Sequence, residues 1–217
     1  MYAYPLQAAV DRPISKAKIY SHAKPSKRVR ELFVSQVADI RWKFKLSPET
    51  INLPANRGIQ ELQIIEVVLK AHELDLGVIH AIEKAIPFPI FLQLVHEDVV
   101  RYCASFKRPS ESDASKWVID AVFQADWQPR NGERPPLPVA LDLYSLYEQM
   151  LRMHIPLQPR TGETLAAHIA RFNQVQTGKK RHSQLQTKLA LERQFNRKVE
   201  LNAQLRELTE QLTELQN

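Results

Sequence analysis

Residues 59–70 read Ile-Gln-Glu-Leu-Gln-Ile-Ile-Glu-Val-Val-Leu-Lys, with apolar side chains at most positions from Leu62 to Leu69. A strand with one solvent-facing side alternates polar and apolar residues, whereas a strand covered on both faces is nearly continuously apolar. The stretch therefore predicts a strand that is buried on both faces of a sheet.

The segment before this strand has a different pattern. Its apolar and charged residues alternate: Ile40, Trp42, Phe44 and Leu46 interleave with Asp39, Arg41, Lys43 and Lys45. This period of two predicts a strand with one buried face and one basic face towards solvent. Upstream, Ser26 is expected to cap a short helix that ends near Gln36, and residues 1–24 are expected to form a basic extended arm.

The segments after residue 70 predict one helix and three more strands. Asp75 can cap a helix that ends before Pro87. Strands are expected over residues 88–95, 99–106 and 117–125, where apolar runs or alternation recur. The order of elements predicts an α+β or mixed α/β domain over residues 25–127, with a sheet of about five strands and flanking helices.

The rest of the chain is expected to be helical. Residues 128–177 combine a Pro-rich linker with packing helices, and the chain has no Gly or Pro from Lys179 onwards. Heptad spacing of four and three residues links Leu201, Leu205, Leu208, Leu212 and Leu215. This spacing predicts a coiled-coil helix over residues 178–217 that binds a partner protein or a second copy through these leucines. Packing along its own domain, or an αα-hairpin with residues 161–177, is the alternative.

Charge is distributed unevenly along the chain. The net charge is +6, which divides into +7 for residues 1–45, −5 for residues 46–170 and +4 for residues 171–217. Basic ends suit contact with nucleic-acid phosphates, but they suit an acidic partner or solvation equally well. The candidate nucleic-acid-binding residues are Lys27, Arg28, Arg30, Arg41, Lys43, Lys45, Lys179, Lys180 and Arg181.

Residues that could support catalysis are few. A restriction-type nuclease places an acid on one strand and an acid two residues before a lysine on the next, so that Mg²⁺ is held beside the amine. Asp39, Glu66 and Lys70 come nearest to this pattern. However, Glu66 is four residues from Lys70, and about 13 Å of strand separates them. We expect an acid at the sheet rim or in an ion pair, and a lysine at a strand end.

Other chemistries have no support in the sequence. Cys103 is the single cysteine, which excludes an intramolecular disulfide, and its apolar neighbours predict a buried thiol. The seven histidines never lie four residues apart, and the five glycines form no phosphate-binding loop, so no metal site or other cofactor is expected. No apolar run approaches 18 residues and no secretory signal is present, so we expect a cytoplasmic protein without membrane contact.

Several short motifs resemble a known family. They are Lys43-Phe44-Lys45-Leu46, Glu49-Thr50-Ile51-Asn52-Leu53-Pro54, Ala85-Ile86-Pro87-Phe88-Pro89-Ile90, Phe106-Lys107-Arg108-Pro109, Leu137-Pro138-Val139-Ala140-Leu141-Asp142-Leu143, Leu146-Tyr147-Glu148-Gln149 and Gln194-Phe195-Asn196-Arg197-Lys198-Val199-Glu200 with Asn202. Together they resemble the bacterial domain-of-unknown-function family 4391 over nearly the whole chain. The family has no established catalytic residues.

The resemblance implies a companion of helicases and DNA methyltransferases in restriction-like or phage-defence gene clusters. With the charge and heptad patterns, it favours a non-catalytic adaptor subunit of a DNA-processing assembly. Such a subunit would dock a partner or itself through the coiled coil and touch nucleic acid through its basic patches. A Mg²⁺-dependent nuclease and a plain nucleic-acid-binding protein are the alternatives.

Overall fold

The structure is a computed structural model that describes residues 2–109 and 117–217. The chain divides into two compact units, Met1–His154 and Ile155–Asn217. We call them the sheet unit and the helical unit. The mixed α/β fold with helices at the C-terminal end is confirmed. None of the helices in the described residues is long and apolar enough to cross a membrane.

The sheet unit is built on one mixed sheet. Its strands, in chain order, are β1 (Ala9–Pro13), β2 (Val37–Leu46), β3 (Leu62–Leu69), β4 (Ile90–His96), β5 (Val99–Pro109), β6 (Trp117–Gln124) and β7 (Gln128–Pro129). The first six lie side by side in sequence order, and β7 pairs with β5. Strands β3 and β4 run parallel and are joined by helix α4 (Leu76–Ala85), while the other pairs are antiparallel.

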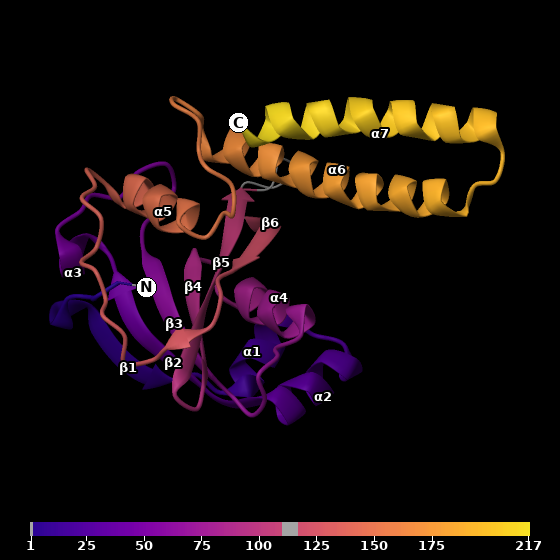
Figure 1. Ribbon diagram of the computed structural model, residues 1–217. Helices are drawn as coiled ribbons and strands as arrows, with labels where there is room; N and C mark the ends of the chain where they lie inside the picture. Colours follow the sequence, from indigo (N-terminus) through magenta and orange to yellow (C-terminus); the bar gives the residue numbers. More distant parts are fainter. Residues whose placement is uncertain (1, 110–116) are drawn as a thin grey trace. The chain divides into compact units, whose positions relative to one another are not determined.

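Helices cover both faces of this sheet (Figure 1). Helices α1 (Lys16–Ala23), α2 (Lys27–Gln36) and α4 pack on one face, where Phe33 and Ile79 meet Ile65 and Val67. Helix α5 (Leu143–Arg152) packs on the other face, where the Tyr147 ring lies 6.1 Å from that of Phe91. The predicted strand with two buried faces is β3. Two short helical turns, η1 (Leu6–Ala8) and α3 (Pro48–Ile51), complete the unit.

The prediction of an extended arm over residues 1–24 is wrong. Residues 9–13 form β1, which adds an edge strand to β2, and residues 16–23 form α1, which is capped by the Ser15 hydroxyl. Only Ile19 and Ala23 of α1 are buried, so the helix is too short and too polar to show a clear period in the sequence. Strands β1 and β7 also raise the strand count from the predicted five to seven within the described residues.

Strand β2 does not keep one basic face. Trp42 is opposite Ile65 and Phe44 is opposite Ile64, so Lys43 is an extra residue in the ladder. A β-bulge of this kind shifts all later side chains to the other face. The prediction that Arg41, Lys43 and Lys45 line a single face is therefore wrong for Lys45.

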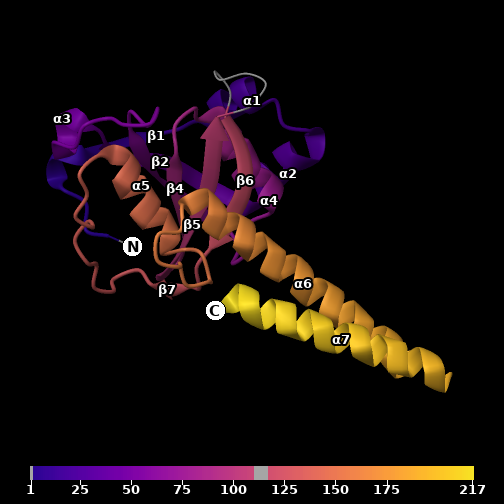
Figure 2. The same cartoon turned by 90° about the horizontal axis from the view of Figure 1, so that it is seen from above.

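The helical unit contains two helices, α6 (Leu165–Leu191) and α7 (Phe195–Gln216), which lie side by side as a hairpin (Figure 2). The prediction of one uninterrupted helix over residues 178–217 is wrong, because the chain turns at residues 192–194. The Glu192 carboxylate accepts hydrogen bonds from the backbone N–H groups of Arg193 and Gln194, at 2.7 and 2.9 Å. A side chain thus holds the turn between α6 and α7, in a stretch without Gly or Pro.

Candidate functional site

The three nuclease candidates are each bound by a different group. Asp39 lies 3.8 Å from the Arg41 guanidinium, and the Glu66 carboxylate lies 3.2 Å from that of Arg130. The Lys70 amine donates to the Val34 carbonyl at 2.7 Å, near the C-terminal end of α2.

Glu66 and α2 are on opposite faces of the sheet. The neighbours of Glu66 in β3, Ile65 and Val67, belong to the core beneath α2, and successive strand residues point to opposite faces. The Lys70 amine is therefore held away from the Glu66 carboxylate. Within residues 2–109 and 117–217, no group of three His, Cys, Asp or Glu side chains is placed to hold a metal ion.

The basic side chains of β2 are paired with acids. Arg41 and Lys43 both bind Asp11, at 3.2 and 2.8 Å, and Lys45 binds Glu61 at 3.2 Å. Hydrogen bonds from Lys43 and Arg41 lower the pKa of Asp11. Each of these three cations thus already has an acidic partner within the chain, and Arg41 and Lys43 share one.

A different part of the chain carries basic side chains without acidic partners. Residues 12–30 contain seven Lys or Arg and no Asp or Glu, and they form the end of β1, α1, a turn and the start of α2. Four exposed side chains here form no ion pair in the part of the chain that the structure describes, and we call them the α1–α2 basic surface: Lys24, Lys27, Arg28 and Arg30. Two of them, Lys27 and Arg28, lie in the first turn of α2, although the positive end of a helix favours acids.

A groove of about 460 Å³ lies beside α1, at the C-terminal end of α4. Its floor and walls are mainly apolar, and two lysines and one histidine stand among them. The lining residues are Ile14, Lys18, Ile19, His22, Trp42, Gln63, Lys84, Ala85, Ile86, Pro87 and Phe88. No acid lines the groove. Trp42 is fixed by its indole N–H, which donates to the Phe44 carbonyl at 2.9 Å.

A buried ion pair shapes one wall of this groove. The Lys107 amine lies 2.7 Å from the Glu83 carboxylate, and both side chains are at most 1% exposed. The same amine donates to the carbonyls of Glu83, Ile86 and Phe88, at 2.9, 3.0 and 2.8 Å. Burial lowers the pKa of Lys107, while the Glu83 charge opposes this shift. Lys107 therefore fixes the segment that leaves α4 by hydrogen bonds to its carbonyl groups.

In the helical unit, the five heptad leucines are the side of α7 that packs on α6. Leu208 is buried and the other four are half-buried, while the remaining α7 residues are exposed. The facing stripe of α6 has the same spacing: Arg171, Val175, Gly178, His182, Leu185 and Leu189. A Cβ atom on Gly178 would lie 2.6 Å from Leu212, so the two helices approach closely there. The leucines thus pack first within an αα-hairpin, but its other helix is Leu165–Leu191 and not the predicted residues 161–177.

Arg171 closes the open end of this hairpin. Its guanidinium binds both oxygens of Glu163, at 2.7 and 2.8 Å, and donates to the carbonyls of Gln158 and Leu215, at 2.6 and 2.7 Å. Arg160 donates to the Glu214 carbonyl. The guanidinium of Arg171 lowers the pKa of Glu163 to about 2. One side chain therefore joins the start of α6 to the last turn of α7.

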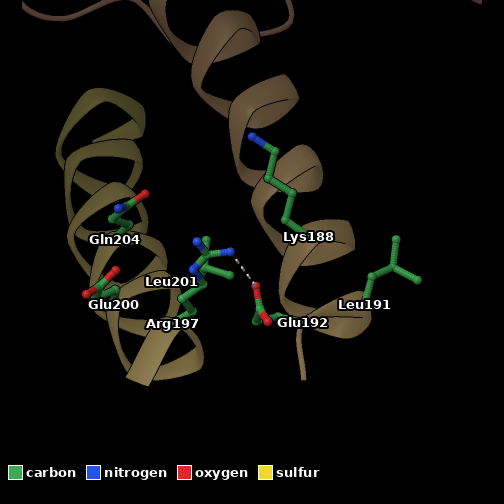
Figure 3. A pocket seen from close by; sticks show the side chains of 7 residues that line it. All are labelled: Lys188, Leu191, Glu192, Arg197, Glu200, Leu201 and Gln204. Carbon is green, nitrogen blue, oxygen red and sulfur yellow. Dashed lines mark ion pairs between the residues drawn. The ribbon is translucent and has the colours of Figure 1, made fainter. Parts of the chain in front are cut away.

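The turn end of the hairpin exposes apolar side chains. Leu191 is 78% exposed, Phe195 77% and Val199 53%. A shallow groove of about 380 Å³ lies beside them, between α6 and α7, lined by Lys188, Leu191, Glu192, Arg197, Glu200, Leu201 and Gln204. Figure 3 shows Leu191 pointing away from α7, and the Arg197–Glu192 ion pair, at 3.9 Å, linking the two helices. We call Leu191, Phe195 and Val199 the hairpin tip.

Comparison with protein families gives one match. Residues 3–212 match the family described as "Domain of unknown function (DUF4391)". The chain belongs to this family. Comparisons with curated proteins and with solved structures find no match. The matched residues span both the sheet unit and the helical unit of this chain.

Sequence reasoning missed the groove in this DUF4391 protein. Lys107 looked like an ordinary strand residue, and nothing in its neighbours predicts that its amine reaches back to residues 83–88. One signal was present: the motifs Ala85–Ile90 and Phe106–Pro109, which both carried the family resemblance, meet through the bonds of Lys107 to Ile86 and Phe88. Cys103 is buried as predicted, and burial raises the pKa of its thiol.

Proposed function

We propose that this DUF4391 protein is a non-catalytic adaptor that contacts nucleic-acid phosphates through the α1–α2 basic surface and holds a protein partner through its helical hairpin. The observation that carries the proposal is the run of seven basic and no acidic residues over positions 12–30. Lysines and arginines without internal counter-charges bind phosphates by releasing the counterions around the nucleic acid.

The position of Lys27 and Arg28 adds support. Basic side chains at the N-terminal end of a helix oppose the helix dipole and cost stability, typically about 0.3–1 kcal/mol each. Their placement there is easier to explain by a bound anion than by folding. In contrast, Arg41, Lys43 and Lys45 already have acidic partners, so they are weaker candidates than the sequence suggested.

The contacts of Asp39, Glu66 and Lys70 favour an adaptor over a nuclease. A nuclease needs its two acids and its lysine free to meet one Mg²⁺ ion and a water molecule. Here two of them form ion pairs with arginines, and the lysine caps α2.

The hairpin tip supports a protein partner. Phe195 and Val199 are exposed and lie four residues apart on one side of α7, and large apolar side chains that are exposed together are typical of interaction sites. The family resemblance points to a helicase or a DNA methyltransferase of a restriction or phage-defence assembly as the partner. A second copy of the chain is the other occupant that the experiment must distinguish.

Nucleic-acid binding is tested with the variant Lys27→Glu/Arg28→Glu. It is expected to weaken binding to a DNA duplex and to reduce the slope of log affinity against log salt by about two or more, because at least two phosphate contacts are lost. The matched control is Lys198→Glu/Arg206→Glu, at two exposed positions of α7 that are not candidate binding residues, which changes the net charge equally. Equal weakening by both variants would mean that net charge, not the α1–α2 basic surface, determines binding.

Partner binding is tested by co-expression with a helicase or a DNA methyltransferase that is encoded in the same gene cluster. The full chain is expected to co-purify with one of them, and Phe195→Ser/Val199→Ser is expected to lose it while keeping its helical circular dichroism. Light scattering of the chain alone tests self-association. In that case the molar mass of the unchanged chain would be twice that of a monomer, and Phe195→Ser/Val199→Ser would return it to the monomer value.

A further inference from the structure

We infer that the groove beside Trp42 binds a nucleotide whose base is unpaired, with its phosphate near Lys18, His22 and Lys84 and its base on the apolar floor. This inference rests on the proposed function and deepens it, because it adds a site for one unpaired base to the phosphate contacts of the α1–α2 basic surface. The same chemistry is offered by a free nucleotide, and the experiment below separates the two sources.

The size and lining of the groove fit such a ligand. Small-molecule sites typically have volumes of about 300–1,000 Å³, and the groove has about 460 Å³. Trp42 and Phe88 both line it and are only half-buried, so part of each ring remains uncovered. Stacking of a base on an aromatic side chain contributes about 1–3 kcal/mol and tolerates any base. The floor is thus suited to a flat aromatic group.

The charges around the groove select an anionic ligand. Lys18 and His22 come from α1 and Lys84 comes from α4, so basic groups from two helices surround one groove that has no acid in its lining. Lys18 and Lys84 are exposed and form no ion pair among the described residues.

The buried Lys107 removes an obstacle to anion binding. Carbonyl groups at the C-terminal end of a helix carry partial negative charge and repel phosphate. Residues 85–88, which begin with the last residue of α4, form one side of the groove. The Lys107 amine donates to the carbonyls of Glu83, Ile86 and Phe88 from the core, and it does not line the groove. These carbonyl oxygens are therefore hydrogen-bonded to a buried group, while the charge of the amine is balanced by Glu83.

The groove also continues the α1–α2 basic surface. Lys18 and His22 are in α1, and Lys24 follows directly after this helix. A strand whose phosphates follow Lys24, Lys27 and Arg28 would therefore bring a neighbouring nucleotide towards α1. In a duplex the bases are stacked inside, so only an unpaired base can enter a groove.

The experiment measures fluorescence anisotropy of the full-length chain with three labelled probes that carry equal numbers of phosphates: an oligothymidylate, the same strand with abasic sites, and a duplex. The oligothymidylate is expected to bind about tenfold or more tightly than the abasic strand, because the abasic strand keeps the phosphates and lacks only the bases. Phe88→Ala and Lys84→Ala are expected to lower affinity for the oligothymidylate about three- to tenfold and to leave duplex affinity unchanged.

The control variant is His80→Ala, which removes an exposed basic residue one turn earlier in α4 and outside the groove. It should bind all three probes as the unchanged chain does. Thermal unfolding of each variant identifies any loss of folding, and Lys84→Ala, at an exposed position, tests the groove even if Phe88→Ala does not fold.

Equal affinity for the oligothymidylate and the abasic strand would overturn the inference while leaving phosphate binding by the α1–α2 basic surface intact. Failure to bind any of the three polymers would overturn the proposed function. Thymidine monophosphate is then titrated alone: saturable binding that Lys84→Ala weakens would assign the groove to a free nucleotide, and no binding would overturn the inference as well.

Discussion

In each of the two units a buried cation fixes the end of a helix, but the two ion pairs differ in how far they are buried. In the sheet unit, Lys107 caps α4 from inside a three-layer core, and its partner Glu83 has no exposed side-chain surface. In the helical unit, Arg171 caps α7 within a pair of helices, and its partner Glu163 is 9% exposed. Some basic side chains of this protein therefore stabilise the fold, and the burial of each one determines how much stability its substitution removes.

The same device occurs in α2. The amine of Lys16 donates to the carbonyls of Phe33 and Val37, at 2.9 and 2.6 Å, and that of Lys70 donates to the carbonyl of Val34. Cations near the C-terminal end of a helix interact favourably with its dipole. An excess of Lys and Arg in the sequence thus overstates the charge that is free to meet a polyanion, and only the residues without such contacts carry the proposed function.

The largest effect is expected from Lys107→Met. The change leaves the Glu83 carboxylate buried without a counter-charge and frees three carbonyl groups, so we expect the sheet unit to lose about 3–5 kcal/mol of unfolding free energy. Chemical denaturation measures this loss. The double variant Lys107→Met/Glu83→Leu removes the unpaired charge and should recover most of it. A double variant no more stable than the single one would mean that the carbonyl contacts, not the charge, dominate.

Loss of Arg171 is expected to have a smaller effect. Arg171→Ala removes charge-assisted hydrogen bonds to Glu163 and to the last turn of α7, but the site lies near solvent that can rehydrate the carboxylate. We expect the helical unit to lose about 2 kcal/mol, seen as a lower melting temperature of the helical signal at 222 nm. Lys180→Ala, an exposed change on the same helix, serves as the control. If Arg171→Lys were as stable as the unchanged chain, the two parallel hydrogen bonds from the guanidinium to Glu163 would be unimportant.

Acid is expected to weaken the helical unit through the same contact. The pKa of Glu163 is lowered to about 2 from an ordinary value near 4.5, so folding favours the ionised form. The stability gained is complete above about pH 4.5 and is lost as the pH falls from there towards 2. A pH titration of the melting temperature measures it, and Glu163→Gln should give a flatter profile in this window. An equally steep profile in that variant would assign the acid sensitivity to other carboxylates.

The sequence predicts some of these features and not others, for physical reasons. The strand at residues 62–69 was predictable because its composition reflects burial on both faces, and α5 was predictable because its apolar residues repeat at helical spacing. The α6 stripe was missed because Arg171, Gly178 and His182 occupy positions where a coiled coil usually has apolar residues. Arg171 and Gly178 are explained by contacts with Leu215 and Leu212, which are distant in the sequence and which local periodicity does not encode.

The candidate site was less predictable than the fold. The pattern of Arg41, Lys43 and Lys45 suggested a basic face, but a bulge at Lys43 and the acids Asp11 and Glu61 could be found only from the strand pairing. The α1–α2 basic surface was partly anticipated through Lys27, Arg28 and Arg30. The groove was not, because its walls come from α1, β2 and the end of α4, which are far apart in the sequence.

The smallest effect is expected at Gly178, where two opposing contributions nearly cancel. Alanine at this position would place its Cβ 2.6 Å from Cδ2 of Leu212, so the leucine must adopt another rotamer and the helices must separate slightly. However, alanine favours a helix over glycine by about 1 kcal/mol. We expect the melting temperature of Gly178→Ala to change little.

Adding Leu212→Ala does not simply restore stability, since it also removes apolar packing. The informative comparison is therefore Gly178→Ala with Gly178→Leu, because leucine offers a similar gain in helix propensity with a much larger clash. A clear loss for leucine alone would show that close approach of α6 and α7, rather than backbone flexibility, explains the glycine.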